Sequence, residues 1–171
     1  MLEGAEGTKV AQVAGGLTEP CAEEGPGVGG RAGDASAAVG EERKPVSELN
    51  AYELGREGER IAQSYLDRRG LKVVSTNWRT PYGEADIVCR SGDEVVLVEV
   101  KTRLCLGESR EDMPELSVDG QKQVRYRRMA LFYMAEHPEV SSVRFDVIAI
   151  NIVGERLAKL RHLVGAFAWD E

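Results

Sequence analysis

Apolar residues recur along the chain after residue 50 with two different periods. Over residues 52–69 they are spaced three and four apart, which gives one apolar stripe and predicts an amphipathic helix. Gly70 then marks the end of that helix. Residues 121–136 show helical spacing as well, so we expect a second helix there.

Four segments are typical of strands. Residues 94–103 contain the continuous apolar run 95–98, which indicates a strand covered on both faces. The other three strands are expected at residues 71–76, 85–90 and 143–150. The pattern over residues 156–167 fits either a strand or a short helix. The order helix-strand-strand-strand-helix-strand predicts one α/β domain.

The composition changes near residue 47. Residues 1–47 hold ten of the 19 glycines, three of the six prolines and none of the aromatic residues. Such a segment cannot bury enough apolar area to offset its chain entropy. We therefore expect a disordered, acidic, Gly- and Ala-rich tail over residues 1–47 and one folded domain over residues 48–171.

Several classes of protein are not expected. No stretch approaches the roughly 18 consecutive apolar residues of a membrane span, and the acidic start does not resemble a secretory signal. Cys21, Cys89 and Cys105 are odd in number and form no C-x-x-C pair. A disulfide framework or zinc site is therefore not expected, and we predict a cytoplasmic location. His137, beside Pro138, is expected to cap a helix end.

The net charge of −7 argues against a wholly basic nucleic-acid binder. The acidic residues are unevenly distributed, however. Residues 1–47 carry a net charge of −4 and residues 108–119 another −4, so the rest of the chain carries +1. Binding of nucleic acid by the folded domain is therefore still open.

Two charged residues follow the buried run of the third strand. Glu99 and Lys101 lie two apart, so alternation places both side chains on one face with Cα atoms about 6.6 Å apart. Charged groups on a central strand are costly unless they are paired or used. They could form a simple ion pair, or they could belong to a functional site.

The turn before that strand brings in two more carboxylates. Residues 92–93 predict a two-residue hairpin loop, which places Asp86 opposite Glu99 and Glu84 opposite Lys101. Opposed carboxylates repel each other, and a divalent cation such as Mg²⁺ would relieve that repulsion. Glu84 and Asp86 could instead be turn residues at a strand start, and a three-residue loop would change the pairing.

The second helix is basic, with no acidic residue over positions 121–135. Its cations could contact phosphates without reading sequence; they are Lys122, Arg125, Arg127 and Arg128. Alternatively, this is a solvated face with Val124 and Leu131 turned to the core. Tyr126 and Tyr133 could stack on bases, although packing within the protein is the favoured interpretation.

The spacing from Asp86 to Glu99-Val100-Lys101 resembles the PD-(D/E)xK nuclease signature on a restriction-endonuclease-like core. The resemblance extends over residues 52–167 through Gly55-x-x-Gly58-Glu59-x-x-Ala62, Asn77-Trp78-Arg79, Gly83-Glu84-Ala85-Asp86, Val98-Glu99-Val100-Lys101-x-Arg103, Arg144-Phe145-Asp146-Val147 and Ala166-Phe167. Together these motifs are similar to the YraN-type family of small endonuclease-like bacterial proteins, which is related to Holliday-junction resolvases. The resemblance also favours a strand near the end of the chain.

The resemblance implies metal-dependent hydrolysis of nucleic-acid phosphodiester bonds, with DNA as the favoured partner and selectivity for DNA structure as an option. Asp86 and Glu99 would hold Mg²⁺ or Mn²⁺, joined by Glu59 from the first helix. Lys101 would orient the attacking water or stabilise developing charge.

The resemblance also implies that Glu84 and Arg103 position the phosphate or support the metal-binding residues. Glu59, taken alone, could be a solvated residue on the first helix. A catalytically weak nucleic-acid-binding module and a protein-interaction domain are the alternatives to a nuclease. A homodimer is expected only by analogy with resolvase-like proteins.

Overall fold

The computed structural model describes residues 9–14, 44–106 and 116–169. In chain order the elements are β1 (Lys9–Ala14), a 3₁₀ helix (Val46–Glu48), α1 (Ala51–Arg68), β2 (Lys72–Thr80), β3 (Gly83–Ser91), β4 (Glu94–Leu104), α2 (Gly120–Glu136), β5 (Ser142–Gly154) and β6 (Leu157–Leu163).

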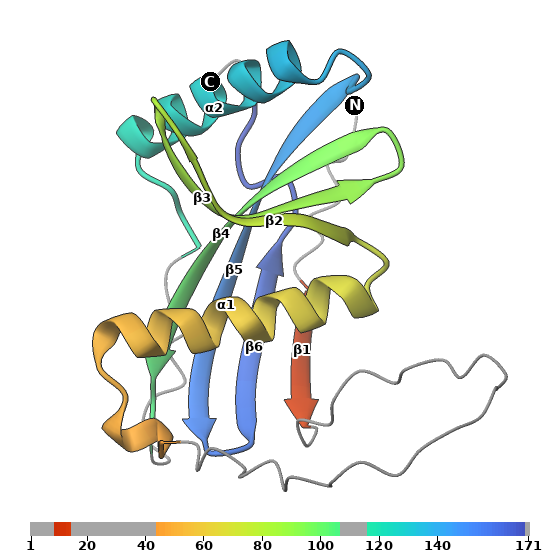
Figure 1. Ribbon diagram of the computed structural model, residues 1–171. Helices are drawn as coiled ribbons and strands as arrows, with labels where there is room; N and C mark the ends of the chain where they lie inside the picture. The colour runs from red at the N-terminus through yellow and green to blue at the C-terminus, as the bar shows by residue number, and fades with distance from the viewer. Residues whose placement is uncertain (1–8, 15–43, 107–115, 170–171) are drawn as a thin grey trace, which may run out of the picture.

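The strands form one mixed sheet in the order β1-β6-β5-β4-β3-β2. The pair β4–β5 is parallel and is connected through α2, whereas every other neighbouring pair is antiparallel. α1 crosses in front of the lower part of the sheet, and α2 lies at the upper end beside the β2–β3 hairpin tip (Figure 1). The predicted α/β class and element order are confirmed, and the ambiguous last segment is strand β6.

The N-terminal segment differs from the expectation in two places. Lys9–Ala14 forms β1, which pairs with β6, although residues 1–47 were expected to be disordered. Val46 is 8% exposed and joins the core, so the packed chain begins before the expected boundary at residue 48. Residues 1–8 and 15–43 lie outside the described residues.

Each helix covers its own hydrophobic core. The core under α1 contains alternate residues of the central strands, among them Ile87, Val98 and Ile148. The core under α2 contains the residues on the opposite face of the same strands, among them Val88 and Leu97. This two-sided covering explains why the central strands are apolar without interruption.

α1 begins with a capping box in which Asn50 and Glu53 satisfy each other's backbone N–H groups. Its close approach to β4 is made possible by Gly58, because a Cβ there would lie 1.8 Å from Oγ1 of Thr102. The absence of a side chain at Gly58 therefore lets α1 pack closely against β4.

α2 buries Met129, Ala130 and two tyrosines. Tyr126 is 2% exposed and Tyr133 is 6% exposed, so both pack within the protein. Val124 and Leu131 are exposed, which corrects the interpretation that turned them to the core. The C-terminus of the helix is capped by the N–H of His137, which donates to Tyr133 O, as predicted.

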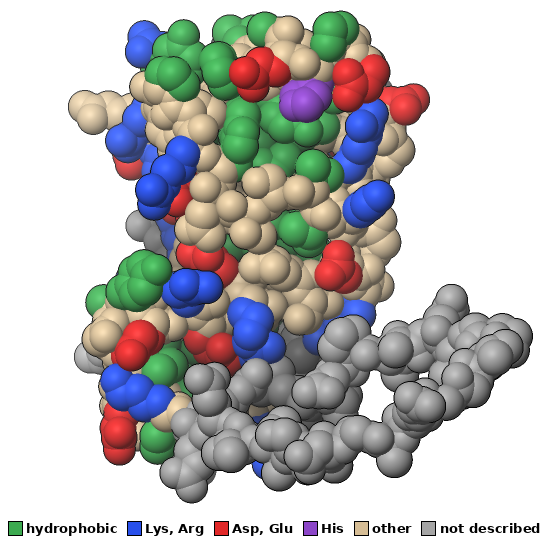
Figure 2. Space-filling model, viewed as in Figure 1, with side chains coloured by type: hydrophobic (Ala, Val, Ile, Leu, Met, Phe, Trp, Pro, Cys, Tyr) green, Lys and Arg blue, Asp and Glu red, His purple; other side chains and the backbone are tan. Residues whose placement is uncertain are grey.

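Neither helix among the described residues has the length and apolar character needed to cross a membrane. On the face seen in Figure 2, apolar side chains gather in the upper part, and Lys and Arg side chains lie along its flanks. Basic and acidic side chains are mixed over the lower part. The basic charge on this face is therefore dispersed and does not form one continuous patch.

Candidate active site

The candidate site lies where β3 and β4 stop pairing. The hairpin has the predicted two-residue loop, with Ser91 opposite Glu94, and its register continues to Ile87 opposite Val98. The next pair would be Asp86 and Glu99, but it does not belong to the ladder. Instead, the N–H of Val100 donates to Oδ2 of Asp86 at 2.7 Å. The Asp86 carboxylate thus takes the place of a β3 backbone carbonyl as the acceptor for the Val100 N–H.

The alternation of β3 is interrupted at the same residue. Ala85 and Val88 both pack on the α2 side although they lie three apart, which a regular strand with a period of two does not allow. On the neighbouring strand, Asn77 has a φ of 51°, an uncommon value that Asn tolerates better than most residues. In the β2–β3 register Asn77 lies at the level of Asp86, so both strands are irregular at that level.

Burial, the larger cause, and the nearby charge of Glu99 together raise the pKa of Asp86 to about 7. The Val100 N–H and the charge of Lys122 act in the opposite direction, and Glu59 adds a small further rise. The negative charge of Glu99 therefore disfavours the ionised form of Asp86.

Glu99 is held by α2. It is 8% exposed. Its Oε2 accepts a hydrogen bond of 2.8 Å from the hydroxyl of Tyr126, and its Oε1 forms an ion pair with Nζ of Lys122. Burial and the Glu99 charge raise the pKa of Tyr126 well above its ordinary value, so this hydroxyl remains a donor.

These two contacts assign new roles on α2. Lys122 was expected to bind phosphate, and Tyr126 was expected to pack. The signal available in the sequence was their spacing of four, which places both side chains on one helix face. Nothing local showed that this face would lie against Glu99, because the contact forms only once α2 docks on the sheet.

Lys101 lies on the same side of β4 as Glu99, as alternation predicted, and its Nζ donates to the carbonyl of Ser117 before α2. Glu84 does not oppose Lys101 in the ladder. It pairs across the other hairpin with Arg79, at 3.1 Å. Arg103 is exposed on β4. The expected pairing of Glu84 with Lys101 is therefore not formed, because the β3–β4 ladder ends before it.

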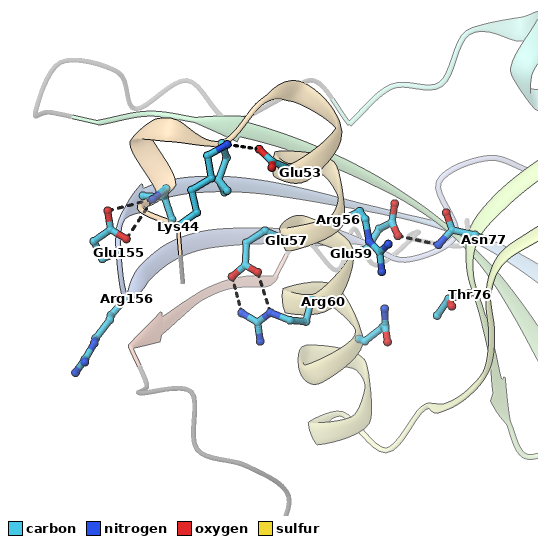
Figure 3. A pocket seen from close by; sticks show the side chains of 13 residues that line it. Lys44, Glu53, Arg56, Glu57, Glu59, Arg60, Thr76, Asn77, Glu155 and Arg156 are labelled. Atoms are coloured by element: carbon cyan, nitrogen blue, oxygen red, sulfur yellow. Dashed lines mark hydrogen bonds and ion pairs between the residues drawn. The ribbon is translucent and has the colours of Figure 1, made fainter. Parts of the chain in front are cut away.

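Glu59 belongs to a different environment. Its Oε2 accepts a hydrogen bond of 2.9 Å from Nδ2 of Asn77, and Figure 3 shows it turned toward that residue from α1. The pocket it lines lies between α1, β2 and the β5–β6 turn and includes neither Asp86 nor Glu99. Within the described part of the chain, no three Asp, Glu, His or Cys side chains are grouped to hold a metal ion. The expected trio is therefore not assembled.

The four cations of α2 divide into two pairs. Lys122 reaches inward to Glu99, and Arg127 donates to the carbonyl of Ala168 at 2.7 Å while its guanidinium lies 5.7 Å from the ring centre of Phe167. Arg125 and Arg128 are exposed. These two arginines are the members of the set that remain oriented toward solvent for a phosphate contact.

A second charged network explains the Arg144-Phe145-Asp146 motif. Asp146 is buried and accepts from Nε of Arg144 at 2.9 Å and from the N–H of Gly165 at 2.9 Å, with Nε2 of His162 at 3.0 Å. Burial alone would raise the pKa of Asp146, but these hydrogen bonds outweigh it and lower that pKa. The network ties β5 to β6 on the α1 side, so we assign it to stability.

Comparison with known proteins gives matches over most of the folded part. Residues 58–150 match the profile of a family described as "Uncharacterised protein family UPF0102". UPF0102 proteins of Thermodesulfovibrio yellowstonii and Beutenbergia cavernae are 43% and 42% identical over 115 residues, which cover 67% and 66% of this chain and 96% and 93% of the relatives. One from Frankia alni is 41% identical over 67% of this chain and 93% of its own length.

Proposed function

The chain belongs to the UPF0102 family, and we propose that it is a metal-dependent nuclease that hydrolyses phosphodiester bonds in nucleic acid, with DNA as the favoured substrate. The family description names no activity, so the support comes from the site itself. The observation that carries the proposal is the convergence of Asp86 and Glu99 where the β3–β4 ladder ends. The similarity of the spacing from Asp86 to Glu99-Val100-Lys101 to the PD-(D/E)xK signature is a second support.

The two carboxylates fit a divalent metal ion without Glu59. Mg²⁺ is commonly held by one or two carboxylates, with waters and substrate phosphates completing its coordination. Burial and Glu99 raise the pKa of Asp86 to about 7, and the positive charge of a bound cation would offset that rise by stabilising the ionised carboxylate. When bound, Mg²⁺ or Mn²⁺ polarises the phosphate and lowers the pKa of a coordinated water. Asp86 and Glu99 are the residues that would hold it.

The protein's other groups around the pair position it and balance its charge. Tyr126 and Lys122 fix the orientation of the Glu99 carboxylate from α2. Lys101, two residues along β4, is the cation that would stabilise charge developing on the phosphate. Arg125 and Arg128 would contact the backbone of the nucleic acid further out, without reading its sequence. The free thiols of Cys89 and Cys105 are consistent with action in a reducing cytoplasm.

A second candidate is a nucleic-acid-binding module of the same fold that cleaves slowly or not at all. The observation that favours it is the ion pair between Glu99 and Lys122. A carboxylate already neutralised by an ammonium group binds a metal ion less tightly, because the cation must displace that partner. The same fold and residues would then bind DNA without turning it over.

Incubation of the protein with branched, single-stranded and duplex DNA in Mg²⁺, Mn²⁺ or EDTA separates these functions. We expect cleavage that EDTA abolishes and that falls at least about 100-fold in Asp86→Asn and Lys101→Met. Asp93→Asn, an exposed acid in the hairpin loop, is the matched control and should retain wild-type cleavage. Equal cleavage by wild type and Asp86→Asn would contradict the assigned site. DNA binding without cleavage in any metal would favour the binding module.

A further inference from the structure

Aromatic side chains gather where the tip of the β2–β3 hairpin packs on α2. The ring centre of Tyr82, at the tip, lies 6.0 Å from that of Phe132, and the two rings meet edge to face. Trp78 continues the series, 6.3 Å from Phe132 and 5.3 Å from the buried Tyr133. Tyr82 is its most exposed member, because 43% of it is exposed whereas Trp78 and Phe132 are half-buried. The tip therefore presents one aromatic ring to solvent, supported by other aromatic rings.

The hairpin tip holds Tyr82 in place. The hydroxyl of Thr80 donates to the carbonyl of Gly83 at 3.0 Å and accepts from the N–H of Tyr82 at 3.1 Å. Pro81 restricts the backbone between them. On the side of α2, a Cβ built on Gly83 would lie 3.4 Å from Sδ of Met129, so the backbone of the tip rests on the helix. A ring on a fixed support loses little conformational freedom when it binds a flat ligand.

Arginine side chains surround the tip. The Cβ of Arg125 lies 4.0 Å from the position that a Cβ would take on Gly83, and Arg128 follows one turn later on the same face of α2. Both are exposed, and α2 carries no acidic residue before its last position. On the hairpin, Arg79 has 80% of its side chain exposed and pairs with Glu84. The surface is therefore positively charged around an aromatic centre. We call it the hairpin-tip surface, and it consists of Arg79, Tyr82, Arg125 and Arg128.

The hairpin-tip surface adjoins the candidate active site along both of its elements. The tip lies beside α2 at the upper end of the sheet (Figure 1). From Gly83, at the tip, β3 reaches Asp86 within three residues, which is about 10 Å of extended chain. On α2, Arg125 directly precedes Tyr126, whose hydroxyl donates to Glu99. A strand of nucleic acid with one phosphate at the two carboxylates therefore has its next few nucleotides within reach of the tip.

Positive charge around an exposed aromatic ring is the combination that binds single-stranded nucleic acid, through phosphate contacts and through bases stacked on the ring. In a duplex each base is covered by its neighbours, so a protein ring needs an unstacked base. We propose that the hairpin-tip surface binds single-stranded DNA, with an unpaired base stacked on Tyr82 and the phosphates held by the arginines. The consequence for cleavage rests on the nuclease function proposed above: the substrates of that nuclease carry a single-stranded segment beside the scissile phosphate.

The test measures binding in EDTA, so that the result depends on neither metal nor cleavage. Fluorescence anisotropy compares oligo(dT) of about 12 nucleotides with a duplex of the same length and with an abasic strand, which keeps the phosphates and lacks the bases. The variants are Tyr82→Ala and Tyr82→Phe. Tyr52→Ala removes an exposed tyrosine from α1 and is the matched control. Tyr82→Leu, which keeps an apolar contact with Phe132 but has no flat ring, replaces the alanine variant if circular dichroism shows that the latter is unfolded.

We expect wild type to bind oligo(dT) at least about tenfold more tightly than the abasic strand. Tyr82→Ala should lose this preference, whereas Tyr82→Phe and Tyr52→Ala should keep it. The slope of log affinity against log salt should be the same in Tyr82→Ala as in wild type, because stacking releases no counterions. In Mg²⁺ or Mn²⁺, wild type should cleave DNA with a single-stranded segment faster than a continuous duplex, and Tyr82→Ala should lose that difference.

The proposal would be overturned if wild type bound oligo(dT) and the abasic strand equally, or if Tyr82→Ala kept the preference for oligo(dT). Tighter binding of oligo(rU) than of oligo(dT) would assign the surface to RNA and remove DNA as its occupant. A failure of the nuclease function gives a different result. Binding of oligo(dT) that depends on Tyr82, without cleavage in any metal, would support the surface and contradict the nuclease. Metal-dependent cleavage without a contribution from Tyr82 would do the reverse.

Discussion

The carboxyl group of Asp86 is subject to opposing influences. Burial and the charge of Glu99 disfavour its ionised form, while the Val100 N–H favours it, and the resulting pKa is about 7 compared with an ordinary value of 3.8. A carboxyl group whose pKa is higher in the folded state binds protons more tightly there. It therefore favours folding below pH 4, and this contribution is lost as the pH rises to about 7.

Asp86→Asn should consequently stabilise the protein at pH 8, by about 2–4 kcal/mol, because the amide keeps an acceptor for Val100 and carries no charge. The difference from wild type should shrink as the pH is lowered and vanish near pH 4. Urea unfolding at pH 4, 6 and 8 measures it. Glu84→Gln, at an exposed carboxylate on the same strand, should show no comparable trend. An Asp86→Asn variant less stable than wild type at pH 8 would contradict the assigned electrostatics.

The hydroxyl of Tyr126 should matter both for stability and for the site. Tyr126→Phe leaves a buried oxygen of Glu99 without its donor, so we expect a loss of about 1–3 kcal/mol in the free energy of unfolding. Cleavage should fall as well, because the carboxylate is no longer held in one orientation. Tyr133→Phe is the control on the same helix, where the ring packs 5.3 Å from the centre of Trp78. Similar losses in both variants would argue against a specific role for the bond to Glu99.

Residues of the site differed in how far the sequence could predict them. Asp86 and Glu99 could be predicted to meet, because hairpin geometry and strand alternation are local rules. The partner of Glu99 could not. Lys122 comes 23 residues later, on a helix whose orientation depends on how it packs against the sheet. Its basic neighbours suggested that Lys122 binds phosphate. The residue type alone does not show whether a lysine faces solvent or packs against the sheet.

At the scale of elements, the contact between α1 and β4 depends on one missing side chain. Gly58→Ala places a Cβ 1.8 Å from Oγ1 and 2.8 Å from the Cβ of Thr102, so α1 and β4 cannot keep their present separation. We expect a destabilisation of about 1–3 kcal/mol, despite the better helix propensity of Ala. Gly55→Ala, three residues earlier with no atom within 4 Å of the added Cβ, should stabilise by about 0.5–1 kcal/mol. Thermal unfolding measures both, and the same sign for the two variants would refute the packing argument.

The elements themselves were largely predictable, because helical and strand periods persisted over their whole length. β2 and β5 are exceptions in extent. β5 runs to Gly154 rather than ending at residue 150. β2 runs to Thr80 rather than ending at residue 76, and Asn77 lies within it in a left-handed backbone conformation that no local pattern indicates. β1 is an exception in kind. Its six residues lie in glycine-rich surroundings, and its partner β6 lies more than 140 residues later. The glycine-rich composition of residues 1–47 predicted disorder, and six residues are too few for a strand pattern to stand out against it.

For the molecule as a whole, the proposed binding to DNA leads to a prediction about its dependence on salt. Arg125→Gln with Arg128→Gln should weaken binding to all sequences alike and reduce the slope of log affinity against log salt by about 2. Arg69→Gln with Lys72→Gln removes the same charge from exposed positions near the C-terminus of α1 and should leave that slope nearly unchanged. Fluorescence anisotropy at several salt concentrations measures it. Equal changes in both pairs would mean that only net charge matters.

The place of β4 in the sheet also has a consequence for the order of folding. Its antiparallel neighbour β3 is reached through a two-residue loop, whereas its parallel neighbour β5 is reached only after all of α2. Loop closure is faster for the local pair, so we expect the β2–β3–β4 meander to form first. Asp86 and Glu99 would then meet before α2 delivers Lys122 and Tyr126. Pulse-labelling hydrogen exchange should show protection of β3 before β5. Low pH should speed that early step, since a protonated Asp86 does not repel Glu99.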